Sequence, residues 1–464
     1  MTRKKIVHPY IPNSSPEVKA RMLQEVGAAN VDEFYADVPS ALRIQGQMDL
    51  PAPFLSEAAL RRHVEGLLRK NTPAQPNRNF LGAGCYQHHV PAICDEINQR
   101  GEFLTAYAGE PYDDHGRFQT LFEYCSMMGE LLEMDVVNVP NYDGFQAAAT
   151  ALRMACRITG RARVLIPDII SQDKQSRLRD YLKPEIEIIV VKHDPSTGGM
   201  DLKRLESLLS STIAAVYFEN PSYLGSLEVC GTEITGMAHK VGALGVVSVD
   251  PISLGILAPP ARYGADIVCG DIQSLGMHMQ FGGGQAGFIA SHDDEKIVMQ
   301  YPSRLFGIAP TRLPGEYGFG DVAYDRTSFA KREEGIEWVG TAAALWGITA
   351  GVYLALMGPQ GMKEIGEGIL YRTRYARQEI GRIKGVSTKL FSAPHFREFV
   401  VDFNKTGMKV AEINKALLSK GIFGGKDLSQ EFPWLGESAL VCVTEVHTQA
   451  DIDLLASTLQ EVVS

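Results

Sequence analysis

Short apolar runs alternate with amphipathic segments through the middle of the chain. The apolar runs are rich in β-branched residues, and their length suits strands better than helices. The segments between them, such as 201–209 and 233–241, space their apolar residues as one face of a helix does. Strands that alternate with helices and are apolar on both faces indicate an α/β domain with a mostly parallel sheet covered on each side. We expect this large domain over 66–335, with strands at 163–167, 186–191, 213–218, 245–249, 266–269 and 286–290.

The first 65 residues show a different pattern, which is polar and helical. Residues 16–23 and 57–68 place their apolar side chains three and four positions apart, as an amphipathic helix does. Several prolines interrupt the path between these two segments. The pattern predicts an N-terminal helical arm over 1–65 that packs on a larger body.

The last third of the chain begins with an uncharged segment at 340–358. This segment is about long enough to cross a bilayer. However, it is rich in Gly, Ala and Thr and follows the charged residues 331–334, so we favour a buried connecting helix over a membrane span. The pattern after it predicts a small α+β domain, which with the connecting helix spans 336–464: strands at 397–403 and 440–444, and a helix at 410–420.

Composition and charge narrow the class of protein. Lys+Arg 45 against Asp+Glu 55 gives a net charge of −10 and a pI near 5.6, which argues against a nucleic-acid partner. The seven cysteines are scattered without a Cys-x-x-Cys pair, which argues against a disulfide framework or a zinc site and favours a reducing cytoplasm. His88 and His89 are adjacent and would not point at one ion, so we expect no metal site. No apolar run follows the basic start, so we predict no secretory signal.

A loop that leads into an Ala-rich helix is the first candidate for ligand binding. Asp143 is placed to cap the helix, and Gly144 would let a ligand approach the backbone. The free N–H groups and the helix dipole at this point favour an anion such as a phosphate. The alternative is a plain helix cap, which an Asp-Gly pair commonly forms.

Polar residues also follow two of the predicted strands. Asn220 and Asp250 stand at strand ends, where an open α/β sheet places its ligand site. Asp250 is a candidate partner for the pyridinium nitrogen of a cofactor, an interaction that strengthens the ring as an electron sink. Ordinary strand-end turns are the alternative. Residues 282–284 are three glycines that indicate either phosphate contact or a flexible turn, and His278 is either an acid or base or a structural residue.

Motifs spread over nearly the whole chain carry a resemblance to one family. The motifs are YIPN at 10–13, VDEF at 31–34, DVP at 37–39, FLGAGCY at 80–86, HVPA at 89–92, EFLTAY at 102–107, YDG at 142–144, NP at 220–221, GADI at 264–267, FGG at 281–283, KGIFGG at 420–425 and VTE at 443–445. No single motif is diagnostic, but so many in order along the chain are specific. Together they resemble subunit 1 of the two-subunit glycine dehydrogenase (decarboxylating), the P-protein of the glycine cleavage system.

The resemblance implies a fold-type-I pyridoxal phosphate architecture, with an aminotransferase-like large domain, in which two homologous chains share the work. In that family a His-Lys pair on subunit 2 binds the cofactor, and subunit 1 lacks the lysine. This chain has no lysine between Lys240 and Lys296. Gln273 and Ser274 stand in the corresponding stretch and cannot form a Schiff base. Pyridoxal phosphate is therefore expected on the partner subunit and not covalently on this chain.

The resemblance also implies a reaction and its partners. A heterotetramer of this chain and the lysine-bearing subunit 2 would decarboxylate glycine, a small amino-acid substrate, and transfer the aminomethyl group to lipoylated H-protein. This chain would shape a shared cleft without a Schiff-base lysine of its own. The candidates for the cleft are Tyr107, Tyr112, His115, Asn220, Asp250, Gln273, Ser274 and His278, and the candidates for cofactor contact are Tyr142, Asp143, Gly144, Gly282 and Gly283.

Two segments depart from the family pattern. Where the family reads Thr-Pro-Tyr-Gln-Pro-Glu and then Ser-Gln-Gly, this chain reads Ala-Gly-Glu-Pro-Tyr-Asp-Asp-His-Gly at 108–116. At 325–341 most polar identities of a second family motif are missing. Three alternatives therefore stay open: a paralogous heteromeric enzyme acting on another amino acid or amine, a non-catalytic scaffold or regulatory subunit, and a stand-alone enzyme that uses a lysine from elsewhere.

Overall fold

The described part of the chain divides into two compact units. The structure is a computed structural model, and the units are Met1–Thr72 and Pro73–Ser464. The predicted domain boundaries at 65 and 335 stay predictions. The described residues are 7–8, 10–44, 46, 48–74, 78–104, 115–331, 337, 339 and 342–464, without the side chains of 115 and 116.

The first unit consists of short helices. The helices α1 (Pro16–Glu25) and α2 (Glu57–Leu68) form where the amphipathic spacing predicted them. None of the described residues in this unit is buried, and large apolar side chains such as Tyr10 and Leu55 are almost fully exposed. The unit therefore has no core of its own among these residues. Its short 3-10 helices are η1 (Pro12–Ser14), η2 (Val31–Tyr35) and η3 (Ser40–Leu42).

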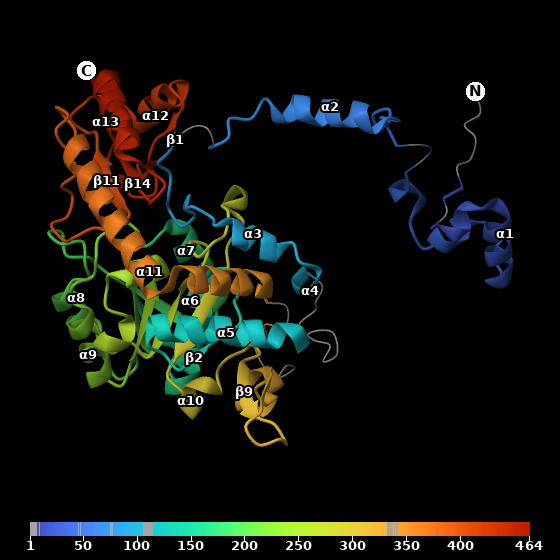
Figure 1. Cartoon of the computed structure of the whole chain (residues 1–464), viewed down its shortest axis with the longest axis horizontal. Helices are drawn as coiled ribbons and strands as arrows, with labels where there is room; N and C mark the ends of the chain where they lie inside the picture. The colour runs from blue at the N-terminus through green and yellow to red at the C-terminus, as the bar shows by residue number, and fades with distance from the viewer. Residues whose placement is uncertain are drawn as a thin grey trace. The chain divides into compact units, whose positions relative to one another are not determined.

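A seven-stranded sheet forms the centre of the second unit (Figure 1). The five strands from β7 to β4 pair in parallel, while β8 and β2 add an antiparallel edge. The mostly parallel α/β sheet predicted from the apolar runs is confirmed. In spatial order the strands are β2 (Val136–Val137), β8 (Gly287–Ser291), β7 (Ile267–Asp271), β6 (Leu244–Val249), β5 (Ala215–Asn220), β3 (Arg163–Pro167) and β4 (Glu187–Val191).

Helices cover both faces of this sheet because alternate strand residues point to opposite sides. In β3, Val164 and Ile166 belong to one apolar core, and Leu165 between them belongs to the other. Both cores are buried, so the strands are apolar on each face as the sequence predicted. One face packs against α6 (Gly144–Thr159), α7 (Gln172–Leu182) and α10 (Glu295–Val298), and the other against α5 (His115–Leu132), α8 (Leu202–Leu208), α9 (Gly231–Lys240) and α11 (Ala344–Ile380).

The helix α11 contains most of the uncharged segment and continues well beyond it. Gly358 has φ 58° and ψ −179°, and Pro359 follows inside the helix, so the helix is kinked at this point (Figure 1). The first half packs on α5 and the second half reaches the small sheet of the C-terminal region. Across the described residues, no helix combines the length and the hydropathy that a bilayer crossing needs.

A second, three-stranded antiparallel sheet forms near the C-terminus, in agreement with the predicted α+β pattern. Its core includes Phe80, which lies more than 300 positions earlier in the sequence. Phe80 follows β1 (Arg78–Asn79), which pairs in parallel with β12 (Ile422–Phe423). The early segment at 78–86 is therefore part of the C-terminal fold. The sheet order is β11 (Glu398–Asp402), β14 (Ser438–Cys442) and β13 (Lys426–Asp427), with α12 (Val410–Ser419), α13 (Gln449–Val463) and η9 (Pro433–Leu435) beside it.

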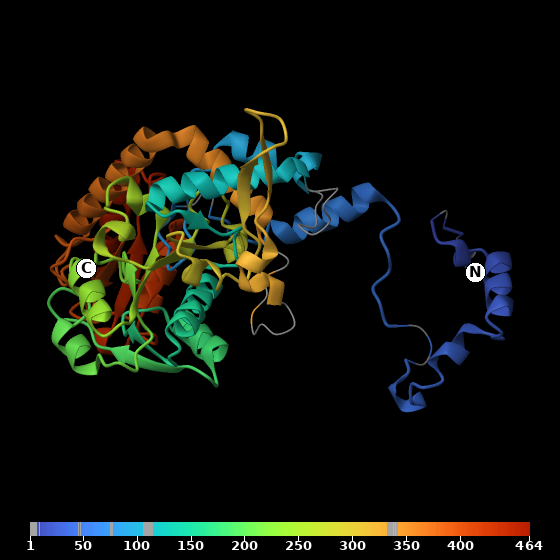
Figure 2. The same cartoon turned by 90° about the horizontal axis from the view of Figure 1, so that it is seen from below.

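Several elements of the second unit were not predicted from the sequence. The hairpin of β9 (Phe306–Pro310) and β10 (Tyr317–Asp321) projects from the body of this unit, as Figure 2 shows. Its strands contain Gly and Pro, which weaken the pattern of a strand. Further such elements include α3 (Ala92–Asn98), α4 (Gly101–Leu104), η4 (Pro251–Gly255), η5 (Pro260–Tyr263), η6 (Gln280–Gly282), η7 (Tyr324–Arg326) and η8 (Ser328–Lys331), as well as the helices α5, α7, α10 and α13.

Candidate functional site

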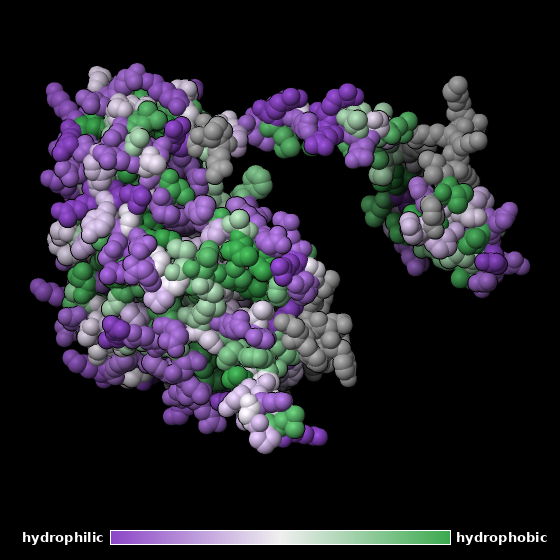
Figure 3. Space-filling model, in the orientation of Figure 1, coloured by the Kyte–Doolittle hydropathy of each residue, from purple (hydrophilic) through white to green (hydrophobic). Residues whose placement is uncertain are grey.

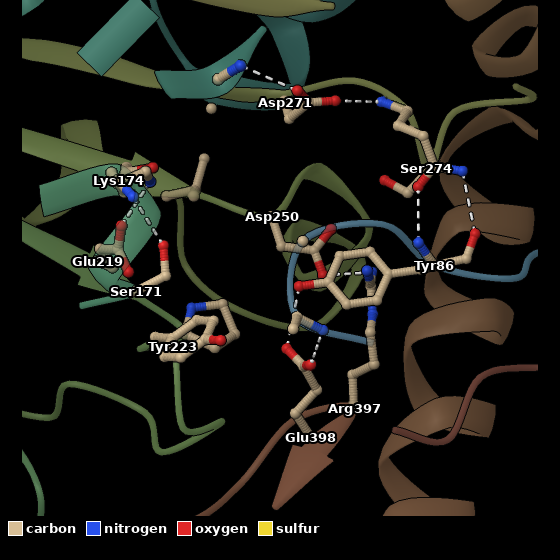
Figure 4. Close-up of a pocket in the computed structure, with 18 of the residues that line it drawn as sticks. Tyr86, Ser171, Lys174, Glu219, Tyr223, Asp250, Asp271, Ser274, Arg397 and Glu398 are labelled. Carbon is tan, nitrogen blue, oxygen red and sulfur yellow. Dashed lines mark hydrogen bonds and ion pairs between the residues drawn. The ribbon is translucent and has the colours of Figure 1, made fainter. Parts of the chain in front are cut away.

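A pocket lies at the carboxyl-end edge of the central sheet (Figure 4). Its cavity measures about 140 Å³. The ends of β5, β6 and β7, the first turns of α6 and α7, and the start of β11 all reach it. This is the edge at which an open α/β sheet binds ligands. The charged and hydroxyl side chains in its wall include Tyr86, Ser171, Lys174, Glu219, Tyr223, Asp250, Asp271, Ser274, Arg397 and Glu398.

Asp271 occupies one backbone donor at the N-terminus of α6. Its Oδ2 accepts the backbone N–H of Gly144 at 2.9 Å, and its Oδ1 accepts that of Gln273 at 2.8 Å. Burial, with a smaller contribution from the nearby Asp143, raises the pKa of Asp271 to about 7 against the lowering effect of these backbone hydrogen bonds. An anion that approached Gly144 would therefore meet a carboxylate already in place.

Gln273 fastens the segment that follows β7 to a distant part of the chain. Its Oε1 accepts the backbone N–H of Tyr86 at 3.0 Å, and its Nε2 donates to the carbonyl oxygens of Tyr86 and Met277, both at 3.0 Å. The side chain is only 2% exposed. Ser274 beside it is also buried, and its Oγ has no hydrogen-bond partner among the described residues. Gln273 thus links the segment after β7 to the backbone of Tyr86. It stands in the stretch where the family resemblance implies a lysine in subunit 2 but none in subunit 1.

Asp250 is paired with a buried arginine. A guanidinium nitrogen of Arg397 forms a short ion pair with the Asp250 carboxylate, and the guanidinium carbon lies 4.0 Å from the centre of the Tyr86 ring. Asp250 also caps η4 by accepting the backbone N–H of Ile252 at 3.1 Å. Burial alone would lower the pKa of Arg397, but the charges around it, Asp250 first, raise the pKa above its ordinary value. Asp250 is therefore engaged within the chain.

Glu398 lies beside this pair on the floor of the pocket. Its Oε1 accepts the backbone N–H of Ala83 at 2.6 Å, and its Oε2 accepts the hydroxyl of Tyr86 at 3.0 Å. Burial raises the pKa of Glu398 to about 7, against the lowering effect of the Ala83 hydrogen bond and the Arg397 charge. The pocket therefore holds two carboxyl groups that titrate near neutral pH.

Lys174 is the one lysine among the described residues that line the pocket. Its Nζ lies 2.5 Å from Glu219 Oε1 and donates to the Tyr217 hydroxyl at 3.2 Å. The first turn of α7 positions it, with Ser171 as the N-cap. A Schiff base requires a neutral amine that is free to attack a carbonyl group. The pairing of Lys174 speaks against its use as the lysine of a stand-alone enzyme.

The structure brings four of the proposed residues to the pocket wall: Gly144, Asp250, Gln273 and Ser274. Asp143 lies behind this wall, where it caps α6 by accepting the Gln146 N–H at 2.7 Å and pairs with Arg177 at 2.8 Å. The plain-cap interpretation of the Asp-Gly loop therefore describes Asp143 correctly.

The remaining proposed residues that the structure describes do not line the pocket. The Asn220 amide bonds to the backbone of Glu228, Tyr142 is 56% exposed, and exposed His278 pairs with Asp95 at 3.0 Å. Gly282 and Gly283 lie in the turn before β8, outside the pocket wall. Tyr107, Tyr112 and the side chain of His115, together with much of the two divergent segments, lie outside the described residues.

Sequence reasoning missed several residues that shape the pocket, namely Tyr86, Lys174, Asp271, Arg397 and Glu398. Asp271 could have been found, since it is an acidic residue at the end of an apolar strand, the same signal that selected Asp250. Arg397 and Glu398 stand directly before the apolar residues 399–401 of a strand, which is also unusual. Nothing in the sequence indicates that Tyr86 would reach the same pocket.

The residues of this pocket do not fit pyridoxal phosphate. The lysine in the wall is engaged by Glu219, and a carboxylate stands at the helix N-terminus that would hold a phosphate group. The acidic partner that a pyridinium nitrogen requires is paired with Arg397. Each of the three anchors that such a cofactor uses is thus taken by another side chain.

Comparisons of the sequence with known proteins agree on one family. A sequence model described as "Glycine cleavage system P-protein" matches residues 8–459. The chain is 37% identical over 466 residues to a probable glycine dehydrogenase (decarboxylating) subunit 1 of Staphylothermus marinus, with 98% of each chain covered. It is 35% identical to a protein of the same name from Moorella thermoacetica, over 98% of this chain and 100% of the relative.

Solved structures show the same likeness. A glycine decarboxylase (P-protein) of the glycine cleavage system, in inhibitor-bound form, matches with a TM-score of 0.84 and 32% identity, over 98% of this chain and 100% of that one. A sphingosine-1-phosphate lyase of Burkholderia pseudomallei matches with a TM-score of 0.66 and 15% identity, over 92% and 94% of the two chains. At that identity the second likeness shows the fold alone.

Proposed function

The chain belongs to the glycine cleavage system P-protein family, and on this premise we propose that it is subunit 1 of a two-subunit glycine dehydrogenase (decarboxylating). The observation that carries the proposal is the whole-length match to relatives of that name, which covers 98% of the chain. The enzyme would decarboxylate glycine and pass the aminomethyl group to lipoylated H-protein. A homologous subunit 2 would complete the active site.

The pocket supports a division of labour in which the partner holds pyridoxal phosphate. When bound, this cofactor supplies the electron sink for decarboxylation. In the present chain Asp271, Gln273 and the Asp250–Arg397 pair fill the positions that the cofactor would need. The cofactor lysine of the complex is therefore assigned to subunit 2.

An exposed apolar surface supports the presence of a partner. Apolar side chains gather over α3 in the space-filling view of Figure 3. Ile93 on α3 and Leu104 at the end of α4 are 42% and 56% exposed. Apolar surface of this kind is typical of subunit interfaces. We assign this surface to contact with subunit 2.

Co-expression with the homologous lysine-bearing chain tests the proposal. The purified complex should show the visible absorbance of an enzyme-bound pyridoxal aldehyde and should exchange labelled bicarbonate into glycine when H-protein is present. The chain expressed alone should show neither. Full activity of the partner without this chain, or cofactor absorbance on this chain alone, would contradict the proposal.

Variants at the divergent segment distinguish a shared cleft from a scaffold. If Tyr107, Tyr112 and His115 contribute to the cleft, alanine at each position should lower the turnover of the assembled complex. The exposed Tyr371 on α11 provides the control. Tyr371→Ala removes a similar side chain at a position far along the sequence from residues 107, 112 and 115. Unchanged turnover in all three variants would favour the scaffold. A screen of small amino acids on the same complex tests whether the divergent segments have changed the substrate.

A further inference from the structure

The guanidinium of Arg397 presents unpaired donors inside the pocket. The Arg397 side chain is 2% exposed, and one terminal nitrogen faces Asp250. Its Nε and Nη1 have no hydrogen-bond partner among the described residues. Buried polar groups are nearly always hydrogen-bonded, and an unpaired charged donor is costly to leave in the interior. An acceptor from outside the described chain is therefore expected at these two nitrogens.

The guanidinium is held in place for such an acceptor. The Tyr86 ring lies against one face of it, with 4.0 Å from the guanidinium carbon to the ring centre. Asp250 holds one end, and Asp250 is itself fixed by its bond to the Ile252 N–H. A planar fork that is already oriented matches the two oxygens of a carboxylate. Arg397 therefore offers a preformed carboxylate site.

The size and charge of the cavity limit the ligand. A cavity of about 140 Å³ is close to the roughly 150 Å³ that accommodates a benzene-sized molecule. Asp271 already occupies the backbone donor of Gly144, so this donor is not available to a phosphate group. Four carboxyl groups line the wall, Glu219, Asp250, Asp271 and Glu398, and each already accepts a hydrogen bond or an ion pair. A ligand with one negative charge suits this wall best.

We propose that this pocket binds a small monocarboxylate, through the unpaired Nε and Nη1 of Arg397, as a site separate from the cofactor site of the complex. Small amino acids, glycine among them, belong to this class. The groups that would bind this ligand all belong to this chain, so binding does not depend on the proposed function.

Binding of acetate to the full-length chain tests the proposal. Calorimetric titration with sodium acetate should show saturable binding with one site per chain, and ethylammonium chloride at equal ionic strength should show none. A parallel glycine titration shows whether an α-ammonium group adds affinity. Arg397→Lys, which lacks the fork, should weaken acetate binding at least about tenfold. Arg153→Lys is the matched control, since Arg153 is also buried but bonds the Tyr181 carbonyl outside the pocket.

A second variant distinguishes loss of the binding site from misfolding of Arg397→Lys. Asp250→Asn removes the carboxylate that competes for Arg397, so acetate should bind about threefold or more tightly than to the wild type. A misfolded protein cannot bind more tightly. The proposal is overturned if acetate does not saturate the wild type, if Arg397→Lys folds and binds as well as Arg153→Lys, or if Asp250→Asn leaves affinity unchanged. In any of those cases, water alone satisfies the Nε and Nη1 donors of Arg397.

Discussion

At the level of single residues, the polar side chains of the pocket pair with one another and with the backbone. Asp271 accepts the Gly144 N–H, Gln273 bonds to the Tyr86 backbone, and Asp250 is paired with Arg397. Each interaction satisfies a group that would otherwise be unpaired in a partly buried place.

Restoring a lysine alone should not restore cofactor binding. We predict that Ser274→Lys and Gln273→Lys, in the chain expressed alone with excess pyridoxal phosphate, give no visible aldimine band and no lysine labelled at either position after borohydride reduction. The reason is that Asp271 still occupies the Gly144 donor that a phosphate group would need. A labelled peptide that contains position 273 or 274 would refute this view of the pocket.

Asp271 should make stability depend on pH. Because the pKa of its carboxyl is raised to about 7 in the folded chain, the folded state keeps a proton that the unfolded chain releases near pH 4. The contribution of this group to the free energy of unfolding therefore falls as pH rises from about 4 to 7 and is constant above that. At about 1.4 kcal/mol per pKa unit, the full effect is up to roughly 4 kcal/mol.

Asp271→Asn isolates this effect, because asparagine resembles the protonated acid and does not titrate. We expect the variant to gain stability relative to the wild type between pH 5 and pH 8, measured from urea unfolding at each pH. Glu398, whose pKa is also raised to about 7, and His395, whose pKa burial lowers to about 4, are present in both proteins and cancel in the difference. A stability difference that does not change with pH would contradict the assignment.

At the level of helices and strands, the sequence predicted the elements whose apolar residues recur with a regular spacing. It missed the features that depend on contacts between residues far apart in the chain. Apart from β2, the strands of the central sheet and the helix α2 appeared close to their predicted bounds, because their periodicity is contained in their own residues. The hairpin of β9 and β10 contains Gly and Pro and was not predicted. In the pocket, Asp250 followed from its strand end, whereas Arg397 could not be linked to Asp250, since 147 positions separate the two residues (397 − 250).

One contact between elements depends on a glycine. Gly225, after β5, has φ +86°, and a Cβ at this position would lie 1.8 Å from the Glu398 carbonyl oxygen at the start of β11. We predict that Gly225→Ala destabilises the chain by on the order of 3–5 kcal/mol, because strain at positive φ adds to a backbone clash. Loss of unfolding free energy in a urea titration, or failure to accumulate folded protein, is the measured result.

Gly282→Ala provides the comparison. Gly282 has φ +90°, but a Cβ there would meet no described atom within 4 Å. This variant should lose only the roughly 1–2 kcal/mol that a left-handed conformation costs an L-residue. Equal losses in the two alanine variants would show that the close approach of Gly225 to β11 does not matter.

At the scale of the whole molecule, the two units differ in how they are stabilised. Residues 73–464 contain several buried apolar cores, and the described residues of 1–72 contain no buried side chain. A segment of that length without a core cannot offset the entropy of ordering its chain. The order of the first unit therefore depends on contacts outside itself.

A peptide of residues 1–72 should accordingly not fold alone. We expect a circular dichroism spectrum with little helix and no cooperative thermal transition, because isolated helices as short as α1 and α2 are marginal in water. The fragment 73–464, measured in the same way, is the control and should melt cooperatively. Cooperative melting of the short peptide would disprove the prediction.

The pairing of β1 with β12 sets an order of events during synthesis. Arg78 and Asn79 find their strand partners at Ile422 and Phe423, and the Phe80 carbonyl accepts the N–H of Cys442. The early segment therefore leaves the ribosome long before its strand partners are synthesised. The apolar Phe80 stays without these partners while the central sheet is synthesised. During that interval the segment is open to chaperones and to premature aggregation. The residues that end this exposure, Ile422, Phe423 and Cys442, are translated more than 300 positions later.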